Sequence, residues 1–160
     1  MKKKEKLLAL IPAIWASLFD IAITIIHQPK EYWNGNLNKA NEGNPIGNLM
    51  MKNHVSGLFI ISIIWLILIG IIGYYLPRKI AQIFLLFVLI VHSCGATTWI
   101  LPNYGFWFFI VFILFNSILF YIIDDKINRK KRTEFEQAFE KNDRVHSNSE
   151  KLKTEFNRIV

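Results

Sequence analysis

The chain contains very little cysteine and little charge. Cys94 is its only cysteine, which excludes an intrachain disulfide and any metal site built from several thiolates. Charged residues make up 19% of the 160 residues, whereas hydrophobic residues make up 52% and stand in long blocks. An ordinary soluble domain interleaves apolar and polar residues, so this pattern excludes that class of protein.

The chain also lacks the diagnostic motifs of catalysis. It contains no H-E-x-x-H, no G-x-S-x-G and no two histidines four residues apart, which are signatures of zinc proteases, serine hydrolases and helical metal sites. Internal repeats and low-complexity tracts are absent from the sequence as well. The motifs therefore indicate neither a reaction nor a cofactor.

Four apolar blocks are present, each long enough to cross a bilayer, which takes about 20 apolar residues in a helix. Prolines close the second and third blocks, and the short gaps that follow make the last three helices antiparallel neighbours. We therefore predict an all-α fold, a four-helix membrane bundle over residues 1–123. Its spans cover approximately residues 7–27, 55–76, 80–101 and 106–123.

Residues 124–160 form a charged tail with ten basic and eight acidic residues. Its apolar residues recur at helical spacing, which predicts an amphipathic cytoplasmic tail made of two short helices with a break at residues 147–149. The tail either rests on anionic lipid or docks onto a cytoplasmic protein. The apolar residues in question are Phe135, Phe139, Leu152, Phe156 and Ile159.

Membrane orientation accounts for the net charge of +7. Basic residues gather before the first span, between the second and third, and after the fourth. The positive-inside rule then places both termini in the cytoplasm, with the 28–54 loop and the 102–105 turn outside. The expected partner is therefore the lipid bilayer, and nucleic acid is not needed to explain the charge.

The first apolar run ends without a small-x-small cleavage motif, so we expect a retained anchor and not a cleaved signal peptide. Lysine, asparagine and isoleucine are abundant, and the chain shows no transit peptide. These features are typical of a multi-pass protein of a bacterial inner (plasma) membrane.

Asp20 is the only acidic residue inside a predicted span. At 1.5 Å per residue, Asp20 lies about 20 Å and His92 about 18 Å from the cytoplasmic ends of their spans, so the two are at nearly equal depth. An ionisable group in a bilayer costs at least a few kcal/mol unless it is paired or hydrated. We therefore predict that these residues are partners. Thr24 and His27 share the helix face of Asp20.

The outer loop predicts a short helix. Asn44 followed by Pro45 is typical of an N-cap and the first helical position. An interruption near residues 52–54 would let this helix fold back over the bundle. Glu42 would then approach Asp20 and the histidines of the bundle.

These residues also carry a resemblance to a known family. Asp20 and Thr24 in the first span, followed by Glu42, Asn44 and Pro45 in the first outer loop, resemble the D-x-x-x-T and E-x-N-P signature of small bacterial four-span membrane proteins of unknown function. The resemblance covers roughly the first two thirds of the chain and leaves out the tail. It implies that the five residues act together, but it supplies no reaction, substrate or cofactor.

Two classes of function fit these observations. In the first, the protein is an accessory or assembly subunit of a membrane complex, and its spans or its tail bind a protein partner. Asp20, Thr24, Asn44, Pro45 and His92 would then form a structural polar cluster that locks the outer loop onto the bundle. Intramembrane polar residues commonly serve packing, which favours this interpretation.

In the second class, the protein is an intramembrane metal-dependent hydrolase. Asp20, Glu42 and His92 would be its catalytic residues, and the same three residues with His27 would bind zinc or a similar ion. A metal-bound water would be the nucleophile. A metal-free version would divide acid and base duties between His92 and a carboxylate.

Overall fold

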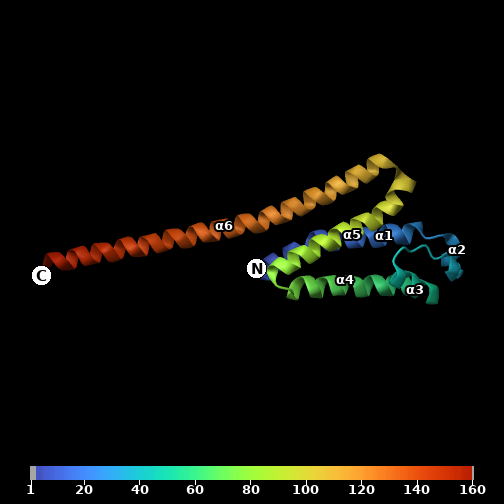
Figure 1. Ribbon diagram of the computed structural model, residues 1–160, viewed down its shortest axis with the longest axis horizontal. Helices are drawn as coiled ribbons and strands as arrows, with labels where there is room; N and C mark the ends of the chain where they lie inside the picture. The colour runs from blue at the N-terminus through green and yellow to red at the C-terminus, as the bar shows by residue number, and fades with distance from the viewer. Residues whose placement is uncertain (1–2, 160) are drawn as a thin grey trace. The chain divides into compact units, whose positions relative to one another are not determined.

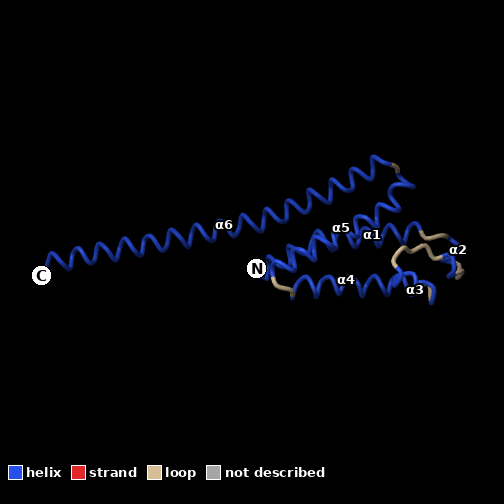
Figure 2. The backbone as a smooth tube through the Cα atoms, in the orientation of Figure 1, coloured by secondary structure: helices blue, strands red, loops and turns tan. Residues whose placement is uncertain are grey.

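The computed structural model describes the backbone of residues 3–159 and the side chains of residues 3–130, 132–133, 135–137 and 139. Over residues 3–159 the chain is helical and contains no strand (Figures 1 and 2). Two compact units are distinguished, Met1–Ile123 and Asp124–Val160. The elements are α1 (Lys3–His27), α2 (Lys30–Trp33), the 3₁₀-helix η1 (Leu37–Lys39), α3 (Pro45–Asn53), α4 (Gly57–Tyr75), α5 (Arg78–Tyr104) and α6 (Phe106–Ile159).

Four of these helices are long and apolar enough to cross a membrane: α1, α4, α5 and the first part of α6. The predicted all-α architecture with four candidate spans is therefore confirmed. Their bounds lie within a few residues of the predicted ones at most ends, because an apolar run of bilayer length has few alternatives to a helix.

The bundle is built around α1, which packs along α5 and is flanked by α4 (Figure 1). Ala13, Ala16 and Ser17 on α1 are completely buried, and such small side chains allow two helix backbones to approach closely. Close to the middle of α1, Ala13 packs against Ile69 of α4 and Val88 of α5. Small residues at the interface therefore determine how tightly α1 is held.

The first part of α6 packs against α1 and α5 through larger side chains. Phe112 stacks on Phe19 of α1, with 4.5 Å between the ring centroids. The side-chain amide of Asn116 donates a hydrogen bond of 3.0 Å to the hydroxyl of Ser93 on α5. Both ends of this hydrogen bond are buried, so it fixes the register between α5 and α6 within the bundle.

The segment between α1 and α4 is folded onto itself and not extended. Gln28 and Asn41 exchange two hydrogen bonds, from the Gln28 side chain to the Asn41 carbonyl at 2.6 Å and from the Asn41 N–H to the Gln28 side chain at 2.9 Å. Tyr32, Met51 and Leu58 form a small buried core beneath it. This loop therefore has a defined shape of its own.

The interruption predicted near residues 52–54 is present. α3 ends at Asn53 and α4 begins at Gly57, with the Gly57 N–H donating to the His54 carbonyl at 2.8 Å. A Cβ at Gly57 would collide with the backbone carbonyl of Met50. Glycine is therefore required where α3 folds back against the start of α4.

Two predicted helix ends differ from the structure. α5 continues through Pro102 to Tyr104, because a proline in the last turn removes only one helical hydrogen bond. Gly105, at φ 84°, is the single residue between α5 and α6. In the tail, the predicted break at residues 147–149 is wrong: α6 is one helix to Ile159, since serine and asparagine disfavour a helix only weakly.

Candidate functional site

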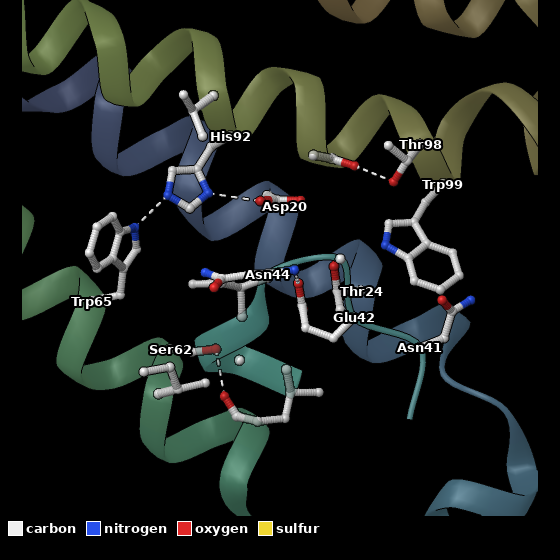
Figure 3. Close-up of a pocket in the computed structure, with 17 residues that line it drawn as sticks. Asp20, Thr24, Asn41, Glu42, Asn44, Ser62, Trp65, His92, Thr98 and Trp99 are labelled. Carbon is white, nitrogen blue, oxygen red and sulfur yellow. Dashed lines mark hydrogen bonds and ion pairs between the residues drawn. The ribbon is translucent and has the colours of Figure 1, made fainter. Parts of the chain in front are cut away.

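Three candidate spans meet at a chain of hydrogen bonds centred on His92 of α5 (Figure 3). Its Nδ1 lies 2.8 Å from Oδ2 of Asp20 on α1. Its Nε2 lies 2.6 Å from Nε1 of Trp65 on α4. The chain Trp65–His92–Asp20 therefore ties together three helices that are far apart in the sequence.

The donors in this chain determine the tautomer of His92. An indole nitrogen can only donate a hydrogen bond, so Nε2 of His92 must accept from Trp65 and carry no proton. The proton then lies on Nδ1, which donates to the carboxylate of Asp20. Both ring nitrogens therefore have a hydrogen-bond partner in this arrangement.

Gly95 makes room for the carboxylate of Asp20. A Cβ at Gly95 would lie 2.7 Å from Oδ2 and 2.8 Å from Oδ1 of Asp20. Those distances are shorter than any ordinary contact, so the carboxylate rests directly against the backbone of α5. The glycine is therefore part of the site although it has no side chain.

The outer loop places Glu42 beside this chain. Oε1 of Glu42 accepts a hydrogen bond of 2.7 Å from the N–H of Asn44, and the side chain of Asn44 accepts one of 3.0 Å from the N–H of Ile46. Asn44 is thus the N-cap of α3, as the sequence predicts, with Pro45 as the first helical residue. A Cβ at Gly47 would lie 2.9 Å from Cγ of Glu42, so the loop folds tightly around this side chain.

Glu42 is half-buried, and burial is the main reason that its pKa is raised above the ordinary value of 4.5. The N–H of Asn44 opposes the rise by stabilising the charged form, while the charge of Asp20 adds to it. Asp20 and Glu42 line the same cavity, so the two carboxylates lie near each other. Glu42 therefore belongs to the same electrostatic environment as the Trp65–His92–Asp20 chain.

A cavity of about 550 Å³ lies in front of these groups, between α1, α4, α5 and the loop before α3 (Figure 3). Its volume is within the range of ligand pockets, about 300–1,000 Å³. Its polar and aromatic walls are formed by Asp20 and Thr24 of α1, Ser62 and Trp65 of α4, His92, Thr98 and Trp99 of α5, and Asn41, Glu42 and Asn44 of the loop.

The structure thus brings together most of the predicted site residues, namely Asp20, Thr24, Glu42, Asn44 and His92. Pro45 starts α3 but does not line the cavity.

His27 is also outside the cavity. Its Nδ1 lies 2.9 Å from the Ile23 carbonyl of its own helix, and its ring stacks on Trp99 at 5.7 Å between centroids. It therefore serves as an aromatic packing group in the structure. In the part of the chain whose side chains are described, no three His, Cys, Asp or Glu residues are placed to hold a metal ion.

Sequence reasoning missed Trp65, Ser62 and Gly95. Trp65 lies 27 residues before His92 on another helix, and a tryptophan in an apolar span gives no sign of a polar partner. Ser62 lies one turn earlier on α4 and lines the same cavity. Ser62 and Trp65 are three residues apart and so share one face of α4, and both side chains can form hydrogen bonds. This spacing is the signal that could have indicated a polar face on an otherwise apolar helix.

Comparison with protein families, with curated proteins and with solved structures gives no match for this chain. Its function is therefore inferred from the sequence, the fold and the residues of the site.

Proposed function

We propose that this polytopic membrane protein is an accessory or assembly subunit of a membrane complex. The observation that carries the proposal is the engagement of both nitrogens of His92, at 2.8 Å to Asp20 and 2.6 Å to Trp65. A histidine held in this way positions helices, and its Nε2 would have to release Trp65 before it could act as a base or a metal ligand. The cluster would then keep the loop and three spans in one arrangement for a partner to recognise.

The surface of α6 supports a partner within the membrane. Trp107 is 78% exposed and Phe108 is 63% exposed, whereas Phe112 on the same helix is 8% exposed. Large aromatic rings are common at protein interfaces as well as at lipid boundaries. The proposal assigns this exposed aromatic face, together with the charged tail at residues 124–160, to contact with the partner.

We place the complex in a bacterial inner (plasma) membrane, with both termini in the cytoplasm. The support is the distribution of Lys and Arg before α1, at the start of α5 and after residue 123. The likeness of Asp20, Thr24, Glu42, Asn44 and Pro45 to a bacterial membrane-protein signature agrees with this assignment, and membership of that family stays a prediction.

Site-specific photocrosslinking in the native host tests the subunit proposal. A photoreactive phenylalanine at Trp107 should capture one discrete protein that also copurifies at a constant ratio in mild detergent. The same group at Phe112 is the control, because that side chain is buried within the bundle. Capture of lipid alone at position 107, with no protein at a constant ratio, would contradict the proposal.

The metal-dependent hydrolase remains the second candidate, favoured by one observation. Asp20, Glu42 and His92 line the same cavity, and the raised pKa of Glu42 suits a general acid. Metal analysis of the purified protein tests it. A divalent ion bound at one per chain and lost in Asp20→Ala or His92→Ala would replace the subunit proposal with this one.

A further inference from the structure

The cavity between α1, α4 and α5 has features that a purely structural cluster does not need. A carboxylate that only joins helices requires a partner, and Asp20 has one in His92 at 2.8 Å. It does not require an adjoining space of about 550 Å³. A cavity of that size, lined by both polar and aromatic groups and lying beside a satisfied hydrogen-bonded pair, indicates a ligand.

The charges around the cavity indicate the sign of the ligand. Asp20 and Glu42 line it, and within the described part of the chain no lysine or arginine does so. His92 is the one basic side chain among the described lining residues, so the two carboxylates outnumber it. The cavity therefore favours a cation over a free anion such as inorganic phosphate.

Several wall groups can accept but not donate hydrogen bonds. The hydroxyl of Ser62 donates a hydrogen bond to the Leu58 carbonyl, and that of Thr98 donates one to the Gly95 carbonyl, each at 2.7 Å. Among the described residues, Oδ1 of Asp20 has no hydrogen-bond donor. These oxygens therefore keep lone pairs that can accept hydrogen bonds from a ligand. Such a wall suits a group that carries several N–H donors.

Aromatic rings and an exposed wall suggest an apolar portion on the ligand. Trp65 and Trp99 both line the cavity, and the faces of tryptophan rings attract organic cations. Trp65 and Val91 line the cavity while being 40% and 45% exposed, so its wall is continuous with the molecular surface between α4 and α5. An alkyl group could therefore extend from the cavity toward the surrounding apolar phase.

We propose that this cavity binds a protonated organic amine, with the ammonium group between Asp20 and Glu42 and the apolar portion against Trp65. The ammonium supplies the three N–H donors that the wall oxygens accept, and its charge offsets that of the two carboxylates. The amine belongs either to a soluble molecule or to a lipid headgroup. This inference goes beyond the subunit proposal, because a subunit can assemble with or without such a ligand.

Thermal unfolding in detergent with a soluble amine tests the proposal first. Hexylammonium chloride should raise the Tm of the purified protein in a saturable way. Hexanol, which has the same chain without the charge, and potassium chloride at equal ionic strength should not. Stabilisation by hexanol equal to that by hexylammonium would overturn the proposal, because the cavity would then recognise only the alkyl chain.

Glu42→Gln removes the charge with little change in shape, so it tests the role of that charge. Because Glu42 lies in a loop, we expect this variant to fold. We expect its apparent affinity for hexylammonium to fall at least about tenfold, the usual effect of losing a hydrogen bond to a charged group. Glu31→Gln is the matched control, since Glu31 is an exposed carboxylate in the same outer segment that does not line the cavity. An unchanged affinity in Glu42→Gln would overturn the proposal.

Native mass spectrometry of the protein from mixed micelles distinguishes the source of the amine. The protein could retain phosphatidylethanolamine in preference to phosphatidylglycerol and phosphatidylcholine, and lose this preference in Glu42→Gln. That result would identify the ligand as a lipid amine. Saturable binding of hexylammonium without such retention would assign a soluble amine. If the protein neither retains phosphatidylethanolamine nor binds hexylammonium, the amine-binding proposal is refuted. The subunit proposal would be unaffected, because crosslinking tests it separately.

Discussion

At the scale of single residues, the Trp65–His92–Asp20 chain shows how a carboxylate is accommodated among apolar helices. The carboxylate of Asp20 accepts a hydrogen bond from Nδ1 of His92, and Nε2 of His92 accepts one from the indole N–H of Trp65. Removing one member of a buried hydrogen-bonded set leaves the next member unsatisfied, which costs more than the net gain from one hydrogen bond. The three residues should therefore respond to mutation as a unit.

Gly95→Ala is predicted to destabilise the bundle by about 1–3 kcal/mol, because its Cβ would displace the carboxylate of Asp20 from His92. Unfolding titrations in mixed detergent micelles measure the change. Gly70→Ala is the control: nothing lies within 4 Å of its Cβ, so the better helix former should be neutral or stabilising by up to about 1 kcal/mol. Equal effects of the two substitutions would show that the contact with Asp20 has no energetic importance.

Glu42 is predicted to give the protein a distinct pH dependence. Burial raises its pKa above 4.5, so the folded state holds the proton more tightly than the unfolded state does. This contribution to stability is fully present below pH 4.5 and is lost as the pH rises through the raised folded pKa. Glu42→Gln should flatten the curve of Tm against pH in that interval, whereas Glu31→Gln should leave it unchanged. A wild-type curve that rises through this interval, unaltered in Glu42→Gln, would contradict the assignment.

The residue pairing was only partly predictable from the sequence. Counting residues along two apolar spans placed Asp20 and His92 at similar depth, since the helical rise is constant. No such counting could identify Trp65, because the rotation of α4 about its axis depends on packing that an almost uniformly apolar helix does not encode. Gly95 was likewise hidden, as its importance arises from the side chain of another helix.

At the scale of elements, the short helix α3 determines where the loop lies. Its N-cap, Asn44, accepts from the N–H of Ile46, and its own N–H donates to Glu42. The cap therefore joins the start of α3 to a wall of the cavity.

Asn44→Ala is predicted to cost about 0.5–2 kcal/mol, the usual effect of losing an N-cap side chain. Hydrogen–deuterium exchange should become faster over Pro45–Asn53 and remain unchanged in α4. Asn53→Ala, at the exposed end of the same helix, is the control, because its side chain only donates to the Leu49 carbonyl at 3.0 Å. If exchange rises equally across α3 and α4, the cap acts globally and not on one helix.

Helix ends were predictable where the local chemistry left few alternatives. The Asn44-Pro45 start of α3 and the interruption before α4 both followed from turn and cap residues. The tail was different, because serine and asparagine at residues 147–149 have only weak local preferences. Such preferences do not stop a helix that has already begun, and the predicted break was therefore wrong.

At the scale of the whole molecule, orientation can be tested with the chemistry of a single thiol. In a Cys94→Ser background, we predict that Asn38→Cys reacts with a membrane-impermeant maleimide in intact spheroplasts. Glu136→Cys should react only after lysis. Both positions are exposed, so a difference in labelling reports the side of the membrane and not burial. The reverse pattern would place the 28–54 loop in the cytoplasm and overturn the topology.

Asp20 and His92 are separated by 72 residues, which has a consequence for biogenesis. At synthesis rates of about 5–20 residues per second, the ribosome needs roughly 4–14 seconds to make the histidine after the carboxylate has been made. During that time the newly inserted first helix carries an acid without its partner. We therefore expect this helix to stay beside water or protein until the third span arrives, because an unpaired carboxylate in lipid is costly.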